Sequence, residues 1–379
     1  MSRGAPFRFY EFFAGGGMAR AGLGDAWTCL FANDFDPLKA ATYRANWGGD
    51  HLRLGDVWAV EPSDLPGGGD LAWASSPCQD FSLAGSRAGL GGGRSSAFWG
   101  FWRLIEALDR AGRAPGVVVL ENVGGLLSSK GGADFTALCG ALAERGYDFG
   151  AMELDAAHFT PQSRPRVFII AAKTPAPDLA GPEPGFGHGA AVRQAHDRLP
   201  QDLAPRWRWW RLGTPATRNT RLADLLEPDH AVAWRTPDQT RALLALLSPQ
   251  HRTRLDEAAA GGARVVAAAF RRIRVEDGVK VQRAELRLDG LAGCLRTPGG
   301  GSSRQLLLVA EGGDIRSRLI SPREGARLMG LAEDYALPPG ATAGFRVIGD
   351  GVAAPVVRFL AQQLLEPLCA RGRIARAAE

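Results

Sequence analysis

Short apolar runs alternate with helix-length amphipathic stretches over residues 7–172 of this 379-residue chain. Runs rich in β-branched and aromatic residues are typical of buried strands, and apolar positions at a period of 3.6 are typical of helices. Strands separated by helices indicate a parallel sheet covered on both faces, so the predicted fold class is α/β. The pattern predicts strands at 7–13, 27–33, 70–75, 116–120, 151–155 and 166–172, and helices at 36–46, 97–111 and 133–145.

The pattern changes at about Thr174, where residues 174–189 are rich in proline and glycine and predict a linker. Residues 193–222 then combine seven arginines and two aspartates with Trp207, Trp209 and Trp210. Further along, where the periodicity is weak, we expect a helical segment at about 237–259 and strands near 265–275 and 279–288. Apolar positions at helical spacing predict an amphipathic helix at 353–369.

These changes predict two domains. We expect a catalytic domain at 1–173 that is completed by residues 345–379, and a smaller domain at 174–344. In an open α/β sheet, ligands bind at the carboxyl ends of the strands. The residues that carry chemistry are therefore expected at that edge of the first domain.

Composition changes this picture only slightly. The chain is 45% apolar and 22% charged, as in an ordinary globular protein, and its net charge of +5 suits a polyanionic partner. Nearly all of the basic residues are arginines, which favours nucleic acid, although a GC-rich genome explains the same bias equally well. No apolar run is long enough to span a membrane, and the first residues carry no secretion pattern.

The five cysteines are odd in number and scattered, with no CxxC spacing. This argues against a disulfide framework and against a zinc site, so we expect no metal and a reducing, cytoplasmic location. Four of the cysteines lie in apolar or unremarkable contexts and are interpreted as packing residues. Cys78 is different, because it follows Pro77 directly after a predicted strand.

A glycine-rich turn follows the first predicted strand, where Phe13 leads into Gly15 and Gly17. Glycines let the backbone turn sharply and approach a ligand closely. Asp34 ends the second strand, where an acid can accept hydrogen bonds from ribose hydroxyl groups. Asp56 can accept a hydrogen bond from an adenine amino group. The alternatives are a helix cap for Asp34 and a plain turn for Asp56.

The remaining chemistry is ordered along the chain. A cysteine thiolate at the mouth of a sheet can add to C6 of cytosine and make C5 nucleophilic. Glu121 closes the apolar run 117–120 and can protonate or hydrogen-bond N3 of the ring, unless it serves as a cap or loop residue. Arg164 and Arg166 occupy alternate positions, so both can reach one pocket, hold the cytosine carbonyl oxygen and fix Glu121; the alternative is surface charge.

Three segments resemble, in their order along the chain, the motifs of the C5-cytosine-specific DNA methyltransferase family of bacteria and phages. They are Pro77-Cys78-Gln79, Glu121-Asn122-Val123 and Gln162-Ser163-Arg164-Pro165-Arg166. Residues 319–330 resemble the ninth motif of this family, and Gly349-Asp350-Gly351-Val352 resemble the tenth. The resemblance covers about 1–172 and 318–369. It implies a Rossmann-like S-adenosylmethionine-dependent methyltransferase sheet and a small target-recognition domain.

The resemblance also implies roles for single residues. Cys78 is the implied nucleophile, Glu121 acts at N3, and Arg164 and Arg166 orient the base. Two positions depart from the family: Asp350 stands where asparagine is usual, which leaves its contact with the cofactor open, and Met18 stands where glycine is common. The implied contacts of S-adenosylmethionine are Phe13, Gly15, Gly17, Asp34, Phe35, Asp56, Val57, Pro77 and Asp350.

The expected partner is double-stranded DNA. A cytosine inside a duplex must be flipped out of the stack before a thiolate can reach it. The glycine-rich segment 80–93 is interpreted as a loop that closes over DNA, with a disordered connector as the alternative. Candidate DNA contacts are the stretch 193–222 and Arg87, Arg94, Arg296 and Arg304.

Two rival functions stay open on the sequence. One is cytosine-5 methylation of RNA on a similar framework, and the other is a non-catalytic DNA-binding regulator derived from such an enzyme. The sizeable middle domain favours DNA, and the retention of Cys78, Glu121 and Arg166 favours catalysis. We expect a monomer, and the family context makes a separate cognate restriction endonuclease a candidate partner.

Overall fold

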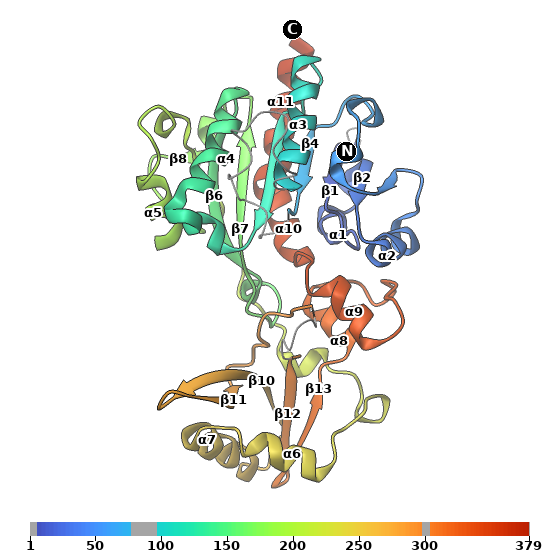
Figure 1. Cartoon of the computed structure of the whole chain (residues 1–379), viewed down its shortest axis with the longest axis vertical. Coiled ribbons are helices and arrows are strands. Elements are labelled where there is room, and N and C mark those ends of the chain that lie inside the picture. Colours follow the sequence, from blue (N-terminus) through green and yellow to red (C-terminus); the bar gives the residue numbers. More distant parts are fainter. Residues whose placement is uncertain (1–5, 77–96, 298–303, 379) are drawn as a thin grey trace. The chain divides into compact units, whose positions relative to one another are not determined.

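The computed structural model describes residues 6–76, 97–297 and 304–378 (Figure 1). Its contacts divide the chain into two compact units. Unit 1 comprises Met1–Asp155, Pro165–Pro215 and Val356–Glu379, and unit 2 comprises Ala156–Arg164 and Ala216–Pro355. These bounds differ from those predicted, because residues 174–215 pack with unit 1, and residues 156–164 and 345–355 pack with unit 2.

Unit 1 is built on a seven-stranded sheet with the order β3-β2-β1-β4-β5-β7-β6. The neighbours are parallel from β3 to β5, but β7 is antiparallel to both β5 and β6, so the expectation of an entirely parallel sheet is wrong at this strand. The strands are β1 (Phe7–Phe12), β2 (Trp27–Asp34), β3 (Leu52–Leu54), β4 (Leu71–Ala74), β5 (Val117–Asn122), β6 (Asp148–Asp155) and β7 (Pro165–Ala172).

The reversal of β7 matters for the site. Glu121 of β5 pairs with Phe168, and Asn122 pairs with Val167, so the start of β7 lies beside the end of β5. Residues just before or at the start of β7 therefore reach the same sheet edge as the carboxyl ends of the parallel strands. Arg166 of the arginine motif lies at this edge, as expected, although the direction predicted for β7 was wrong.

Helices cover both faces of this sheet (Figure 1). Helix α3 has apolar side chains along one face, and Phe98, Phe101, Leu104 and Ile105 are fully buried against the sheet. Helix α2 begins where Asp36 accepts hydrogen bonds from its first turn. The helices of unit 1 are α1 (Met18–Leu23), α2 (Pro37–Trp47), α3 (Ala97–Arg110), α4 (Ala133–Glu144), α5 (Ala190–Asp197), α10 (Ala354–Leu360) and α11 (Glu366–Ala378), with a π turn at Ala361–Leu365.

The tryptophan-rich stretch is part of this core. Trp207 and Trp210 are buried in unit 1, and the indole N–H of Trp210 donates to the carbonyl oxygen of Ile170 at 3.0 Å. Two short strands, β8 (Ala180–Gly181) and β9 (Trp209–Trp210), pair beside it. These two tryptophans are therefore packing residues, and the expected linker and start of a second domain are wrong here.

Unit 2 contains a four-stranded antiparallel sheet with the order β11-β10-β12-β13. Its strands are β10 (Val265–Glu276), β11 (Val279–Arg287), β12 (Leu306–Glu311) and β13 (Asp314–Leu319). The single helix predicted at 237–259 is two helices, α6 (Pro237–Leu244) and α7 (Pro249–Ala260), because Ser248 caps the second helix and Pro249 begins it. The apolar sides of α6 and α7 pack with one face of the sheet.

The segment that resembles the ninth motif forms helix α8 (Pro322–Leu328) of unit 2, followed by α9 (Ala341–Ile348). Ser321 and Glu324 form a reciprocal capping box at the start of α8. Both carboxylate oxygens of Glu324 also bind the guanidinium of Arg318, at 2.5 and 2.7 Å, and both side chains are buried. None of the helices in the described parts of the chain has the length and apolarity needed to cross a membrane.

Candidate active site

The glycine turn between β1 and α1 uses a backbone conformation that ordinary residues avoid. Phe13, Gly15 and Gly17 have φ values of 56°, 57° and 78°. Glycine adopts this left-handed region at little cost, which explains two of the three positions. A Cβ built at Gly15 would meet nothing within 4 Å, so the turn faces open space at that point.

The turn is supported from its other side by α2. The indole N–H of Trp47 donates to the carbonyl oxygen of Gly16 at 3.0 Å, and a Cβ at Gly17 would lie only 2.3 Å from the Trp47 Nε1 atom. The guanidinium of Arg20 lies 5.0 Å from the centre of the Trp47 ring. Gly17 is therefore required by close packing as well as by its φ value.

Asp34 joins the ends of the first two strands. Its carboxylate accepts from the backbone N–H of Gly15 and of Asp36, both at 2.8 Å, and burial raises its pKa above the ordinary value. Asp36, not Asp34, caps helix α2, so the capping alternative for Asp34 is wrong. The carboxylate oxygens have further lone pairs, which leaves Asp34 able to accept ribose hydroxyls as predicted.

An exposed aromatic side chain follows Asp34. Phe35 is 67% exposed, which is unusual for phenylalanine beside a folded core. The N–H of Gly55 donates to the carbonyl oxygen of Asp34 at 3.0 Å and so holds the Asp56 turn nearby. Asp56 is exposed and accepts a hydrogen bond from the N–H of Trp58, as expected for the alternative in which it is a turn residue. Val57 is buried.

Together these residues fit S-adenosylmethionine. The open space at Gly15 gives a close approach to the backbone, Phe35 offers a free apolar face to an adenine ring, and Asp34 and Asp56 offer acceptors. All of them belong to unit 1. Their contacts with the cofactor remain predictions.

Glu11 of β1 lies beneath this turn and was missed by the sequence interpretation. It is 1% exposed, and the N–H of Arg20 donates to one of its oxygens at 3.3 Å. Burial raises the pKa of Glu11 to about 8. The hydroxyl of Tyr43 and the ring of His51 complete a polar cluster with Arg20. An acid inside the aromatic strand Phe9–Phe12 was the available signal.

Glu121 ends β5 in a buried position and is paired with Arg166. The Arg166 Nε atom lies 3.2 Å from Glu121 Oε1, and the two side chains are 15% and 6% exposed. A buried carboxylate with an arginine partner is held in one orientation, because the guanidinium is planar. The predicted pairing of Arg166 with Glu121 is thus present in the structure.

The start of the segment that carries Cys78 is fixed at the same edge. The side chain amide of Asn122, next to Glu121, donates to the carbonyl oxygen of Ser76 at 3.0 Å. Asn122 therefore joins the end of β5 to the chain that follows β4. Pro77 and Cys78, like Arg87 and Arg94, lie outside the described residues.

Arg164 has a different setting. It is buried in unit 2, and its guanidinium donates to the carbonyl oxygens of Leu295, Gly349 and Gly351 at 2.9, 2.8 and 2.6 Å. The Arg164 guanidinium thus binds carbonyl oxygens of unit 2, whereas Arg166 pairs with Glu121 in unit 1, so a shared pocket for the two arginines remains a prediction. Arg164 joins separate segments of unit 2, and a role in orienting the base is better supported for Arg166.

Three further predicted residues, Asp350, Arg296 and Arg304, belong to unit 2. Asp350 is exposed and accepts a hydrogen bond from the Thr297 hydroxyl at 2.6 Å, so part of its carboxylate is occupied. Arg304 donates to the hydroxyl of Thr342 at 2.5 Å, and Arg296 is exposed. A contact of Asp350 with the cofactor, and contacts of both arginines with DNA, remain predictions.

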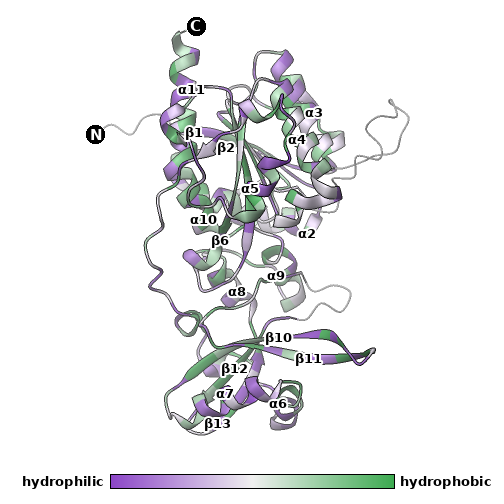
Figure 2. Ribbon diagram, turned by 90° about the vertical axis from the view of Figure 1, so that its left-hand side faces the viewer, coloured by the Kyte–Doolittle hydropathy of each residue, from purple (hydrophilic) through white to green (hydrophobic). Residues whose placement is uncertain are grey.

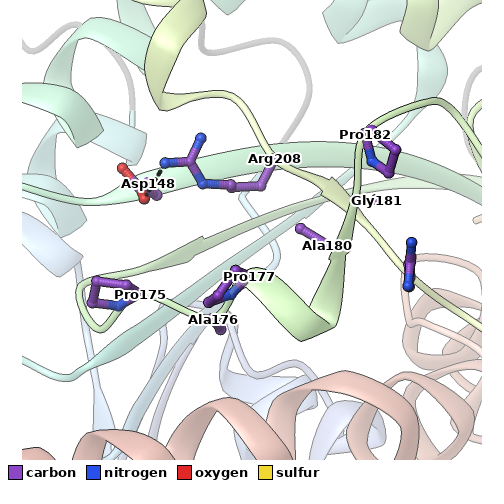
Figure 3. A pocket seen from close by; sticks show the side chains of 9 residues that line it. Asp148, Pro175, Ala176, Pro177, Ala180, Gly181, Pro182 and Arg208 are labelled. Atoms are coloured by element: carbon purple, nitrogen blue, oxygen red, sulfur yellow. Dashed lines mark hydrogen bonds and ion pairs between the residues drawn. The ribbon is translucent and has the colours of Figure 1, made fainter.

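A surface pocket of about 490 Å³ in unit 1 lies apart from these residues (Figure 3). Three prolines from the segment after β7 line it together with Asp148 and Arg208, which form an ion pair at 2.7 Å. It contains none of the predicted site residues. We therefore assign it no part in the chemistry.

The model of one protein family, described as C-5 cytosine-specific DNA methylase, matches residues 7–366. The chain belongs to this family. Its membership confirms the predicted enzyme class, an S-adenosylmethionine-dependent DNA (cytosine-5-)-methyltransferase, and so confirms the cofactor and the DNA substrate expected from the motifs.

Relatives match this methyltransferase along nearly its whole length. Type II methyltransferase M.NlaX of Neisseria lactamica is 26% identical, and the match covers 96% of this chain and 98% of the relative. Type II methyltransferase M.HhaI of Haemophilus parahaemolyticus is 24% identical over 94% of each chain. Type II methyltransferase M.SsoII of Shigella sonnei is 25% identical over 96% of this chain and 81% of its own.

Solved structures support the fold of this methyltransferase. The Dnmt2 methyltransferase of S. pombe has a TM-score of 0.61 at 16% identity, with 96% of this chain and 99% of that chain covered. A putative DNA modification methyltransferase encoded within an E. coli prophage has a TM-score of 0.53 at 16% identity, with 95% and 99% covered. At this identity the likeness concerns the fold alone.

Proposed function

We propose that this methyltransferase flips a cytosine from duplex DNA, adds the Cys78 thiolate to C6 of the ring and methylates C5. The observation that best supports the proposal is the buried Glu121–Arg166 pair at the end of β5, with the chain leading to Cys78 held beside it by Asn122. Two peptide units separate Ser76 from Cys78, which is about 7 Å at full extension. Proximity of the Cys78 thiolate to Glu121 is part of the proposal, since Cys78 itself lies outside the described residues.

The residues divide the chemistry between them. Thiolate addition to C6 pushes electron density toward N3, where Glu121 donates a proton or a strong hydrogen bond. Arg166 holds the Glu121 carboxyl in place, which limits the directions from which it can meet the ring. When bound, S-adenosylmethionine supplies the electrophilic methyl group. The C5 proton then passes to solvent, the N3 proton returns to Glu121, and departure of the Cys78 thiolate restores the aromatic ring.

The cofactor would be held in unit 1. Gly15 and Gly17 give its close approach to the backbone, Phe35 stacks on adenine, and Asp34 and Asp56 accept from ribose and adenine. The support comes from the φ values of the glycines, the open space at Gly15 and the exposure of Phe35. The DNA would be read by unit 2 as a target-recognition domain.

The finer partner assignments belong to the same proposal. The chain works as a monomer in the cytoplasm, and a separate restriction endonuclease acts on the same sequence. The restriction partner is supported by relatives named Type II methyltransferases. The cytoplasmic location is supported by Cys29, Cys139 and Cys369, which are buried and form no disulfide among the described residues.

The test incubates the purified protein with tritium-labelled S-adenosylmethionine and either duplex DNA or transfer and ribosomal RNA. DNA from a host that lacks cytosine methylation keeps every target available. We expect label in DNA only, and bisulfite sequencing of that DNA then gives the target sequence. Label in RNA alone would refute the substrate, and binding of DNA without any transfer would favour the non-catalytic regulator.

A further inference from the structure

The β10–β11 hairpin of unit 2 extends beyond its sheet. Strand β12 pairs only with Val265–Ala269 of β10, whereas β10 and β11 continue to pair with each other as far as Glu276 and Val279 (Figure 2). The outer seven residues of β10 therefore form a two-stranded ribbon of roughly 20 Å. Asp277 and Gly278 close it with φ values of 50° and 78°, as in a tight two-residue hairpin turn.

The two faces of this ribbon differ in charge. Directly paired residues of antiparallel strands point to the same face, so the pairing assigns each side chain. On the ion-paired face, Arg274 binds Glu285 at 2.5 Å and Arg283 binds Glu276. Arg272 lies 4.0 Å from Glu285 on that face. The arginines of this face are therefore largely neutralised by their neighbours.

The opposite face, here called the open face, carries Arg271, Ile273, Val275, Lys280 and Gln282. All five side chains are exposed, and Ile273 and Val275 are 58% and 68% exposed. Among the described residues, neither Arg271 nor Lys280 takes part in an ion pair. The open face therefore combines exposed apolar side chains with cations that have no ion-pair partner among the described residues.

We propose that the open face of the β10–β11 hairpin is a DNA-contacting surface, with the ribbon lying in a groove of the duplex. The major groove is about 12 Å wide and admits a two-stranded β-ribbon. Arg271 and Lys280 then contact phosphates or guanine, Gln282 is able to pair with adenine, and Ile273 and Val275 pack on thymine methyl groups. This inference rests on the proposed DNA substrate.

Charge supports DNA over a second copy of the chain. Residues 270–284 carry five basic residues against two acidic ones. Strand β11 is at the edge of its sheet, so another chain could pair with it, but a second copy would bring the same excess of positive charge to the contact. A polyanion meets the same residues with opposite charge.

The test compares two double variants that remove the same charge. Arg271→Ala/Lys280→Ala alters the open face, and Arg272→Ala/Arg274→Ala is the matched control on the ion-paired face. Binding of end-labelled genomic fragments, from a host without cytosine methylation, is measured by filter retention over a range of salt concentrations. All four side chains are exposed, and thermal unfolding checks that both variants fold.

We expect the open-face pair to weaken binding about tenfold or more and to lower the salt slope by about 2, since each lost phosphate contact removes about 0.9. The control pair is expected to change binding less than about threefold, because its arginines are already paired. Equal losses of DNA affinity in the two double variants would show that only net charge matters and would overturn the proposal. The proposal would also be overturned if light scattering showed that the wild-type protein forms a dimer and that only the open-face double variant is monomeric. The open face would then bind a second copy of the chain. Failure of the wild type to methylate DNA is a separate outcome that refutes the proposed function instead.

Discussion

Substitution of Gly17 by alanine tests the structural account of the cofactor turn. The new methyl group would lie 2.3 and 2.6 Å from two atoms of the Trp47 ring and 3.0 Å from Tyr43. Gly15→Ala is the matched control, because Gly15 also has a positive φ but its Cβ would meet nothing within 4 Å. The two variants share the backbone strain and differ in the collision.

The magnitudes follow from these contacts. Placing alanine in the left-handed region costs about 1 kcal/mol at either position. At Gly17, overpacking adds about 1–3 kcal/mol, and displacement of Trp47 from its hydrogen bond with Gly16 adds about 1 kcal/mol. We therefore expect a loss of about 3–5 kcal/mol in the free energy of unfolding for Gly17→Ala, against about 1 kcal/mol for Gly15→Ala.

Urea denaturation of both variants, with and without S-adenosylmethionine, measures both effects. A ligand that binds only the folded state stabilises it in proportion to the logarithm of its concentration over its Kd. Since the Cβ at Gly15 enters the open space proposed for the cofactor, Gly15→Ala is expected to lose most of the ligand-induced stabilisation. Equal stability losses for the two variants, or full stabilisation of Gly15→Ala by the cofactor, would refute this reasoning.

Two further predictions concern buried acids. Arg166→Ala should lower kcat by about 100-fold. Because Arg166 acts through Glu121, the double variant Arg166→Ala/Glu121→Gln should be little slower than Glu121→Gln alone. Additive losses of rate in single-turnover kinetics would contradict this coupling. For Glu11, burial raises the folded-state pKa to about 8, above its ordinary 4.5, so the folded state holds a proton that the unfolded state releases. The stabilising contribution of Glu11 to the free energy of unfolding is fully present below pH 4.5 and is lost as the pH rises toward 8, by a few kcal/mol in all. Glu11→Gln should remove this slope in urea titrations from pH 5 to 8, and an identical slope in the variant would show that Glu11 is already ionised.

The sequence was most informative where local signals agree with tertiary packing. The strands and helices predicted within residues 7–172 are all present within a few residues, because buried strands are continuous apolar runs and α3 has a strong amphipathic period. The short elements α1 and β3 were missed. The turn at Gly15 was recognisable because few residue types allow it. The break between α6 and α7 was missed although Ser248-Pro249 is a helix-start signal.

Other features depend on contacts between residues that are distant in sequence. Strand direction is not encoded in an apolar run, so β7 was given the wrong direction. The burial of Trp207 in unit 1 depends on Phe135 and Phe149, far earlier in the chain. Arg164 and Arg166 look equivalent in the motif, but only the structure shows that one donates to carbonyls of unit 2 and the other pairs with Glu121.

The open face of the hairpin was visible only after the strands were paired. In the sequence, residues 270–284 are a mixture of arginine and β-branched residues without a clear period. Exposed valine occurs on both faces, but the pairing separates one face rich in ion pairs from one face whose basic side chains form no ion pair among the described residues. Candidate DNA contacts chosen from arginine content alone therefore missed this surface.

The most direct test of the central claim is covalent trapping at Cys78. Duplex DNA that contains 5-fluorocytosine at the methylated position is incubated with the protein and S-adenosylmethionine, because fluorine at C5 cannot leave as a proton and the thiolate stays bonded to C6. We predict a denaturant-stable adduct whose tryptic peptide carries the modified base on Cys78, and no adduct with Cys78→Ser. An adduct on another residue, or one that persists in Cys78→Ser, would contradict the account.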